Sequence, residues 1–317
     1  MSLNARQSET VGRSLHIGVA DTLGEPPEWL RSGVAFAGIY DDYVDTDQGD
    51  PIGHGTTVLK TVARNAPEAV YSTFQIAGEK DGDGEYAEGG RRGDLVSAVS
   101  DAADAGVDLL NISAGISHEC GGLCSLAREV ELAATVDDMC VVAATGNRDP
   151  STPSREGLNC PALTESTLGV AGFMPHCEAE SRTDDSSQWW LLDGNREQTV
   201  PFCGYRECCG EQPCDTNRRE VCWDGNVSFH NAFPDVFAPP VAVDIDQSGE
   251  LVAQLGTSFA APLVTGLLAA IQSDVLQVSD KPTAEELQAA VRTGGVELDE
   301  NGYYKMDCQN TWDELRQ

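Results

Sequence analysis

Three side chains that together can perform nucleophilic catalysis lie in separate short motifs of this sequence. Asp21 ends the apolar run IGVAD, His54 lies in GHGT, and Ser258 lies in GTSFAAP at the start of a long apolar segment. A serine hydroxyl is a weak nucleophile at neutral pH and needs an adjacent base, which His54 can supply. A buried carboxylate at Asp21 would fix the imidazole tautomer and stabilise the imidazolium. The three motifs therefore predict acyl-transfer chemistry.

A fourth motif offers a hydrogen-bond donor for the oxyanion that acyl transfer produces. Asn147 ends the segment AATGN directly after an apolar run, and its side-chain amide can donate to an oxyanion. The backbone N–H of Ser258 is a second candidate, because a helix N-terminus carries unpaired donors and the positive end of the helix dipole. We expect both donors to face the same reacting atom.

Each of these residues also has an ordinary structural interpretation. Ser258 could simply cap a helix, His54 could be a structural histidine, and Asn147 could be a loop amide. Asp21 has three nearby rivals, which are Asp41, Asp42 and Asp45. The seven-residue context of Ser258 and the position of Asp21 at the end of a buried run favour the catalytic interpretation.

The elements that must position these groups alternate along the chain. Short apolar runs predict buried strands, and helical patterns lie between several of them. The strands are expected at 15–20, 34–38, 70–76, 107–112, 139–144 and 168–171, and the helices at 55–65, 94–105, 125–137 and 258–273. This alternation predicts an α/β fold with three layers (α/β/α) and a mostly parallel central sheet. In such a sheet the strand C-termini and the following helix N-termini share one edge, so distant motifs can converge there.

The motifs resemble the subtilisin-like serine protease (subtilase) family. The order Asp–His–Ser is that family's order, and GTSxAxP, present here as GTSFAAP, is its specific element. The resemblance covers roughly residues 15–173 and 230–315. It implies a subtilisin-like fold and a serine endopeptidase that hydrolyses protein or peptide substrates without a metal or cofactor in the chemical step. The rival hypothesis is a catalytically inactive binding or regulatory protein on the same fold.

The resemblance also implies roles for individual residues. Asp21 would orient His54, His54 would act as general base and then acid, Ser258 would be the nucleophile, and Asn147 would donate to the oxyanion. Two segments would bind substrate: Ser113, Ala114 and Gly115 by pairing with extended peptide, and Ala144, Thr145 and Gly146 by lining the pocket for the residue before the scissile bond. The sequence departs from the family's usual residues at Thr57, Phe259 and Ala114. None of these belongs to the triad that Asp21, His54 and Ser258 would form.

A cysteine-rich segment interrupts the alternating pattern. We predict one domain over residues 1–317 with an insertion at 174–231, which holds Cys177, Cys203, Cys208, Cys209, Cys214 and Cys222. The other cysteines are Cys120, Cys124, Cys140, Cys160 and Cys308, so the total of 11 is odd and at least one thiol lacks a partner within the chain. Disulfides would require an oxidising compartment, and the C-x₃-C and C-x₄-C spacings leave a structural zinc site open. We assign no metal ligand, and expect Cys140 to be an inert core thiol.

The charge balance excludes some partners. The net charge is −32, and only four lysines accompany 52 acidic residues. Such a surface repels phosphate and anionic lipid, so we expect neither nucleic-acid nor membrane binding. A lysine-poor, acid-rich surface indicates a halophilic protein, because concentrated salt screens the repulsion. The acidic loop at 41–50 either holds a structural Ca²⁺ through its oxygen ligands or is simply solvated.

The N-terminal region shows no apolar core of a signal peptide, which predicts a cytoplasmic protein. Only 20 residues precede Asp21, fewer than a folding prodomain would occupy. An intracellular member that folds unaided and a secreted, trimmed mature form both remain open.

Overall fold

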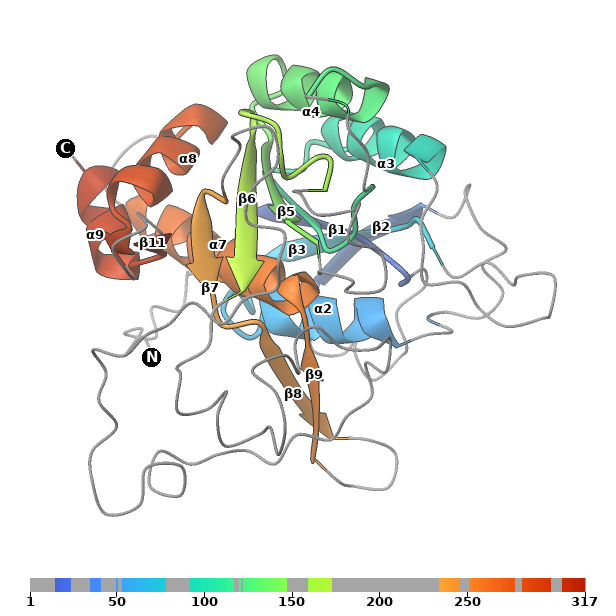
Figure 1. The fold of residues 1–317 in the computed structure, drawn as a ribbon, viewed down its shortest axis with the longest axis horizontal. Helices are drawn as coiled ribbons and strands as arrows, with labels where there is room; N and C mark the ends of the chain where they lie inside the picture. Colours follow the sequence, from blue (N-terminus) through green and yellow to red (C-terminus); the bar gives the residue numbers. More distant parts are fainter. Residues whose placement is uncertain are drawn as a thin grey trace, which may run out of the picture.

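A parallel sheet forms the centre of the chain (Figure 1). The computed structural model describes residues 15–23, 35–40, 50, 53–77, 92–116, 120, 122–146, 159–172, 234–245, 251–276, 281–297 and 304–316. The predicted insertion at 174–231 and Asn147 lie outside these ranges. The described strands of the sheet are β1 (His16–Asp21), β2 (Ala35–Tyr40), β3 (Val70–Gln75), β4 (Leu109–Ile112), β5 (Cys140–Ala144), β6 (Thr167–Gly172), β7 (Val236–Ala238), β10 (Val296–Glu297) and β11 (Tyr304–Lys305).

The strand order places β1 inside the sheet. The order is β10-β11-β7-β6-β5-β4-β1-β3-β2, and each neighbouring pair is parallel except β10 with β11. Strand β1 therefore lies between β3 and β4. Because the strands are parallel, the chain leaves β1 at Asp21, β4 at Ile112 and β5 at Ala144 along one edge of the sheet.

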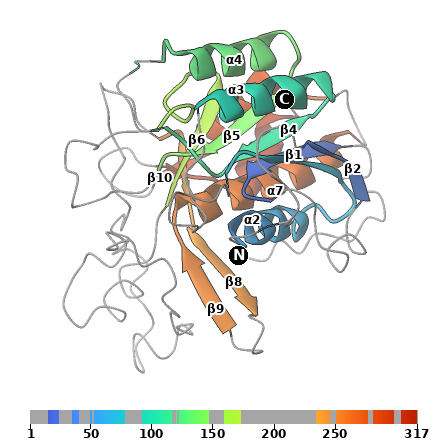
Figure 2. The same ribbon diagram turned by 90° about the vertical axis from the view of Figure 1, so that its right-hand side faces the viewer.

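Helices cover both faces of the sheet, as predicted (Figures 1 and 2). On one face lie α3 (Arg92–Asp104) and α4 (Ser125–Thr135), and on the other lie α2 (His54–Ala63) and α7 (Thr257–Val275). Residues of β5 alternate between the two resulting cores: Val142 belongs to the core that includes α2 and α7, and Val141 to the core that includes α3 and α4. Burial on both faces explains why the strands read as continuous apolar runs.

Helix α7 packs closely against α2. A Cβ atom built on Gly266 would lie 2.7 Å from the carbonyl oxygen of Val62 and 3.0 Å from Cβ of Asn65. Only glycine fits at this approach, which brings the two helices that carry His54 and Ser258 together. By length and composition α7 could cross a membrane, but 72% of its apolar window is buried inside the protein, as expected of a core helix.

Every predicted strand and helix has a counterpart in the structure, with ends that differ by a few residues. Helix α8 (Ala284–Thr293) begins with a capping box, in which Thr283 accepts from the backbone N–H of Glu286 and the Glu286 side chain accepts from the backbone N–H of Thr283. Helix α9 (Cys308–Glu314) follows it.

Several short strands were not predicted. A separate antiparallel pair, β8 (Val241–Ile245) and β9 (Leu251–Leu255), leads directly into α7, and Gly256 donates its N–H to the carbonyl of Pro240. This pair extends away from the central sheet (Figure 2). The remaining strands, β7, β10 and β11, have three residues or fewer. Runs this short carry no measurable period of two, so apolar patterning does not detect them.

Candidate active site

The Asp21 carboxylate lies buried at the C-terminal end of β1. Its side chain is only 2% exposed. Its Oδ1 accepts hydrogen bonds from the backbone N–H of Thr22 and from Nδ1 of His54, both at 2.7 Å. Its Oδ2 is also buried and has no hydrogen-bond partner among the described residues. The carboxylate is therefore fixed in place, with the imidazole as its only described side-chain donor.

His54 is the first residue of α2. The N-cap residue Gly53 has a φ of 81°, a left-handed conformation that favours glycine. The next glycine, Gly55, is required for space, because a Cβ there would lie 2.5 Å from the backbone nitrogen of Leu23. The motif GHG thus lets the first turn of α2 approach the end of β1 closely. A carboxylate only accepts hydrogen bonds, so the bond to Asp21 places a proton on Nδ1 of His54 and makes Nε2 the basic nitrogen.

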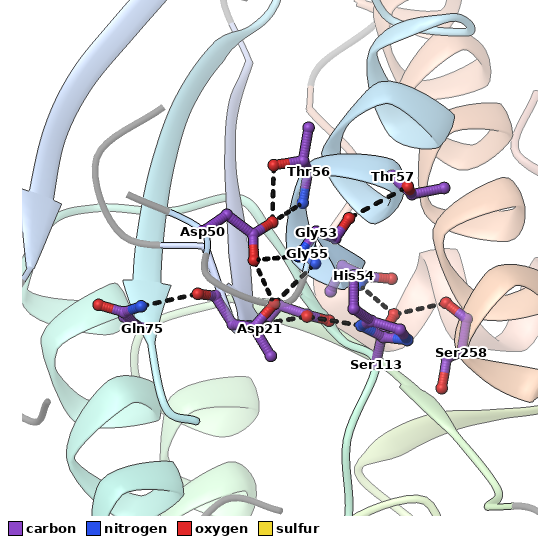
Figure 3. Close-up of polar contacts among 12 residues, drawn as sticks. Asp21, Asp50, Gly53, His54, Gly55, Thr56, Thr57, Gln75, Ser113 and Ser258 are labelled. Carbon is purple, nitrogen blue, oxygen red and sulfur yellow. Dashed lines mark hydrogen bonds and ion pairs between the residues drawn. The ribbon is translucent and has the colours of Figure 1, made fainter. Parts of the chain in front are cut away.

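Asp50 connects the end of β1 with the start of α2 (Figure 3). One carboxylate oxygen accepts from Oγ1 of Thr22 and the backbone N–H of Gly53, both at 2.8 Å. The other oxygen accepts from the backbone N–H and the hydroxyl of Thr56, both at 2.6 Å. Gly53 provides no side-chain cap, so Asp50 performs the capping of α2 from outside the helix. This role was not predicted, because in the sequence Asp50 is only one of several acidic residues in the loop at 41–50.

Ser258 lies in the first turn of α7, next to a hydrogen-bonded chain from β4. The hydroxyl of Ser113 donates to the carbonyl of Ser258 at 2.7 Å and accepts from the amide of Asn111 at 2.9 Å. The hydroxyl of Thr265 donates to the Asn111 side chain at 3.1 Å. These hydrogen bonds fix the N-terminus of α7 at the end of β4. The side chain of Ser258 is half-buried, and its backbone N–H belongs to the helix N-terminus, where such groups lack an intrahelical acceptor.

The three predicted triad residues meet at one edge of the sheet. The imidazole of His54 packs against the ring of Phe259, with ring centroids 5.2 Å apart, and Phe259 directly follows Ser258. Figure 3 shows the His54 ring between the Asp21 carboxylate and the start of α7 that bears Ser258. Phe259, where the family usually has methionine, thus contacts His54, the predicted base. The side chain of His54 is 21% exposed, so the site is accessible from solvent.

The predicted substrate segments lie beside the triad. Strand β4 ends at Ile112, so Ser113, Ala114 and Gly115 form an extension beyond the regular strand. The Ser113 side chain is engaged with α7, as described above. On the neighbouring strand, Ala144 is 3% exposed and Thr145 is fully buried.

Gly146 has a φ of 96°. This left-handed conformation is one that favours glycine, and it turns the chain immediately before Asn147. Asn147 itself lies outside the described residues, so its role as oxyanion donor stays a prediction.

Two sets of described side chains could in principle bind a metal ion. Asp50 is the one described residue of the acidic loop at 41–50, and both its carboxylate oxygens already accept hydrogen bonds from the protein. A Ca²⁺ ion in this loop, one of the two alternatives left open by the sequence, therefore cannot use Asp50 without breaking the cap of α2. Among the described residues, one other group of ligand side chains converges, namely Cys120, Cys124 and Cys160.

Comparison with known proteins agrees with this geometry. Residues 16–302 match the family model described as the Subtilase family. No curated protein matches the chain. Solved structures with a similar fold include the prenylagaramide maturation protease PagA, at 16% identity and a TM-score of 0.60 over 96% of this chain and 95% of that one.

Two further structures have the same fold. A mutant of the protease domain of PatA is 16% identical, with a TM-score of 0.61 over 98% of each chain. A lanthipeptide protease is 15% identical, with a TM-score of 0.63 over 96% of this chain and 89% of that one. Because the family match extends over most of the sequence, the chain belongs to the subtilase family and is a subtilisin-like serine endopeptidase.

Proposed function

We propose that this chain cleaves peptide bonds through an acyl-enzyme on Ser258, with His54 as the base and Asp21 as the residue that orients it. The observation that carries the proposal is the 2.7 Å hydrogen bond between Nδ1 of His54 and the buried Asp21 carboxylate, with the same imidazole packed beside the start of α7. This bond directs the basic Nε2 away from Asp21, which is the arrangement that activation of a serine hydroxyl requires.

In the acylation step, Nε2 of His54 removes the hydroxyl proton of Ser258 while Oγ attacks the carbonyl carbon of the substrate. The imidazolium that forms is stabilised by the buried carboxylate of Asp21. His54 then gives the proton to the leaving amine as the C–N bond breaks. In deacylation, a water molecule takes the place of the amine, and the same imidazole transfers protons in the reverse direction.

The negative charge on the carbonyl oxygen needs donors that are already in place. We assign this role to the backbone N–H of Ser258, in the first turn of α7, and to the side chain of Asn147. The hydrogen bond from Ser113 to the carbonyl of Ser258 supports this role, because it fixes the orientation of that helix turn. Replacing Asn147 by Ala should lower kcat by about 10²–10³, the size known for the equivalent change in subtilisin.

The substrate class follows from the segments beside the triad. The backbone of Ser113, Ala114 and Gly115 would pair with an extended peptide, with a pocket near Ala144–Gly146 for the residue before the scissile bond. Gly115 leaves room for the backbone segment at Asn159, since a Cβ on residue 115 would lie 2.7 Å from Cβ of Asn159. An extended peptide fits this arrangement better than a small ester does.

We further infer that the enzyme works at high salt concentration. The net charge of −32 and the shortage of lysine support this inference. The Debye length falls to about 3 Å at 1 M salt, which removes most of the repulsion between surface carboxylates.

The test is hydrolysis of casein and of fluorogenic peptides in multi-molar KCl by the wild type and by Ser258→Ala. We expect Ser258→Ala to lose on the order of 10⁶-fold in kcat, the size known for subtilisin. Ser125→Ala is the matched control, because Ser125 also begins a helix, α4, but lies away from the triad; it should keep full activity. If a well-folded wild type cleaves no peptide, the rival hypothesis of an inactive binding protein on this fold is favoured instead.

A further inference from the structure

Three thiols converge at a point that the proposed catalytic mechanism does not use. The sulfur atoms of Cys120, Cys124 and Cys160 all lie within 4.8 Å of one another, and those of Cys124 and Cys160 are 3.4 Å apart. Cys160 is fully buried, whereas Cys120 and Cys124 are half-buried. The three residues come from the loop after β4 and from the segment before β6, so their approach is a product of the tertiary fold.

The local backbone directs these sulfurs toward one another. Gly122 has a φ of 76°, a left-handed conformation that turns the chain between Cys120 and Cys124. The backbone N–H of Leu123 donates to the carbonyl of Cys120 at 2.9 Å, which closes this turn. Ile116 and Cys160 exchange two backbone hydrogen bonds, of 2.9 and 3.0 Å, and so hold the third thiol beside the same loop.

Cys124 is also placed where a thiolate is stable. It is the N-cap of α4, and its sulfur accepts a hydrogen bond from the backbone N–H of Ala127 at 3.5 Å. The positive end of the helix dipole favours negative charge at this position. A backbone N–H that donates to sulfur is a common feature of thiolate ligands, because it offsets part of the charge that the ligand carries.

We propose that Cys120, Cys124 and Cys160 together bind one Zn²⁺ ion. Sulfur atoms bound at 2.3 Å to a tetrahedral zinc ion lie about 3.8 Å apart, so the observed spacing needs only small adjustments. Binding releases the three thiol protons to the buffer and gives a complex with a net charge of −1. No fourth His, Cys, Asp or Glu of the described residues joins the group.

Such an ion would link α4 with the two proposed substrate-binding segments. Cys124 is the N-cap of α4, Cys120 follows the segment 113–116, and Cys160 follows Asn159, whose backbone N–H donates to the carbonyl of Thr145 at 2.8 Å. We therefore assign the ion a structural role, in which it holds the segment at 113–116 beside Asn159 and Cys160. A disulfide between Cys124 and Cys160 would use only two of the sulfurs and would leave Cys120 beside it as a free thiol.

The experiment measures metal binding on the full-length chain, without reference to activity. Protein is purified anaerobically, stripped with a chelator and titrated with Zn²⁺, and bound zinc is counted by mass spectrometry. The insertion at 174–231 holds six further cysteines, which could bind zinc themselves. The result is therefore the difference in bound zinc between wild type and each variant. Wild type should bind one more zinc per chain than Cys120→Ser or Cys124→Ser. Cys308→Ser, which changes a half-buried thiol outside the group, should bind as much as wild type.

A second measurement resolves the site by residue and needs no variant. Cysteine alkylation is followed by peptide mapping with and without Zn²⁺, and zinc should slow the labelling of Cys120 and Cys124 at least tenfold while leaving Cys308 unchanged. The proposal is overturned if zinc protects neither Cys120 nor Cys124, if the variants bind as much zinc as wild type, or if the anaerobic protein contains a Cys124–Cys160 disulfide. None of these outcomes bears on the peptidase assignment.

Discussion

At the scale of single residues, Asp50 joins the end of β1 to the start of α2. Its four hydrogen bonds reach Thr22, Gly53 and Thr56, and His54 lies in the same first turn of α2. We therefore expect Asp50 to hold the backbone of His54 at the end of β1.

Replacing Asp50 by Ala tests its role in positioning His54. The change removes the carboxylate that caps the first turn of α2 and joins it to Thr22, while the direct bond from the N–H of Gly55 to Oγ1 of Thr22 remains. The free energy of unfolding should therefore fall by about 2–3 kcal/mol. The imidazole would also lose its fixed position, and kcat should fall by about 10²-fold with little change in KM. Urea unfolding and steady-state kinetics measure the two effects. Asp104→Ala, at an exposed site on α3, should change neither, and an unaltered kcat in Asp50→Ala would contradict this role.

The Asp21→Asn variant separates orientation from folding. The amide keeps the size of the carboxylate but favours the wrong imidazole tautomer, so kcat should fall by about 10⁴-fold, the size known for this change in serine proteases. The variant should remain folded by circular dichroism. Retention of more than a tenth of wild-type kcat would show that Asp21 does not orient the base.

The sequence indicates the candidate chemical groups more clearly than the residues that position them. Asp21, His54 and Ser258 lie in short motifs at the end of β1 and in the first turns of α2 and α7, so their placement at one edge of the sheet could be predicted. The role of Asp50 could not, because only the folded chain brings its hydrogen-bond partners together. The group of three cysteine sulfurs likewise forms only in the folded chain.

At the scale of helices and strands, the two cores and the parallel sheet follow from apolar patterning. The close approach of α2 and α7 depends instead on the absence of a Cβ atom at Gly266. The sequence alone does not indicate which backbone carbonyl a glycine in an apolar helix will contact. The structure shows that this carbonyl belongs to Val62, on the helix that carries His54.

Gly266→Ala should therefore disturb both stability and catalysis. The added methyl group would lie 2.7 Å from the Val62 oxygen, so the helices must separate slightly. We expect the free energy of unfolding to fall by about 1–3 kcal/mol. We also expect kcat to fall, since α2 and α7 carry His54 and Ser258, two residues of the proposed triad. The control is Asp274→Ala, at an exposed position on the same helix. A Gly266→Ala enzyme with wild-type melting temperature and kcat would refute the close-packing argument.

The end of α8 is tied to the sheet by a charged pair whose effect depends on pH. Asp235 accepts from Nε of Arg292 and from the backbone N–H of Gly169, both at 2.6 Å. Burial raises the pKa of Asp235 above its ordinary value, although Arg292 acts in the opposite direction. An acid whose pKa is higher in the folded state stabilises the fold below its unfolded pKa, and that contribution is lost as pH rises through the folded value.

Arg292→Gln removes the cation and raises the pKa of Asp235 further. Both side chains are partly exposed, so we expect a loss of about 1–2 kcal/mol at pH 7, less than for a fully buried pair. The difference from wild type should shrink as pH falls into the acidic range, because Asp235 then becomes protonated in both proteins. Denaturant unfolding at several pH values measures this, with the exposed Arg128→Gln as the charge-matched control. A difference that is independent of pH would exclude Asp235 as its cause.

At the scale of the whole molecule, net charge and fold are separate properties of the sequence. The α/β architecture follows from the order of strands and helices, and it would be the same at any surface charge. The charge of −32 instead determines in which solvent the compact state is stable, because self-repulsion of carboxylates opposes folding at low ionic strength.

The melting temperature should therefore rise steeply as KCl increases from 0.1 M to multi-molar concentrations, since screening removes the repulsion. Calorimetry measures the shift, and sorbitol at matched osmolality is the control, because it leaves the charges unscreened. Equal stabilisation by the two solutes would contradict the proposed adaptation to salt.

We have proposed that Ser258 becomes nucleophilic through His54 and Asp21. Covalent labelling with a fluorophosphonate in high salt, followed by peptide mapping of the adduct, tests this role without a substrate. We expect one phosphonylated residue, Ser258, and labelling that is at least a thousandfold slower in His54→Ala. An adduct on another residue, or undiminished labelling of Ser258 in His54→Ala, would contradict it.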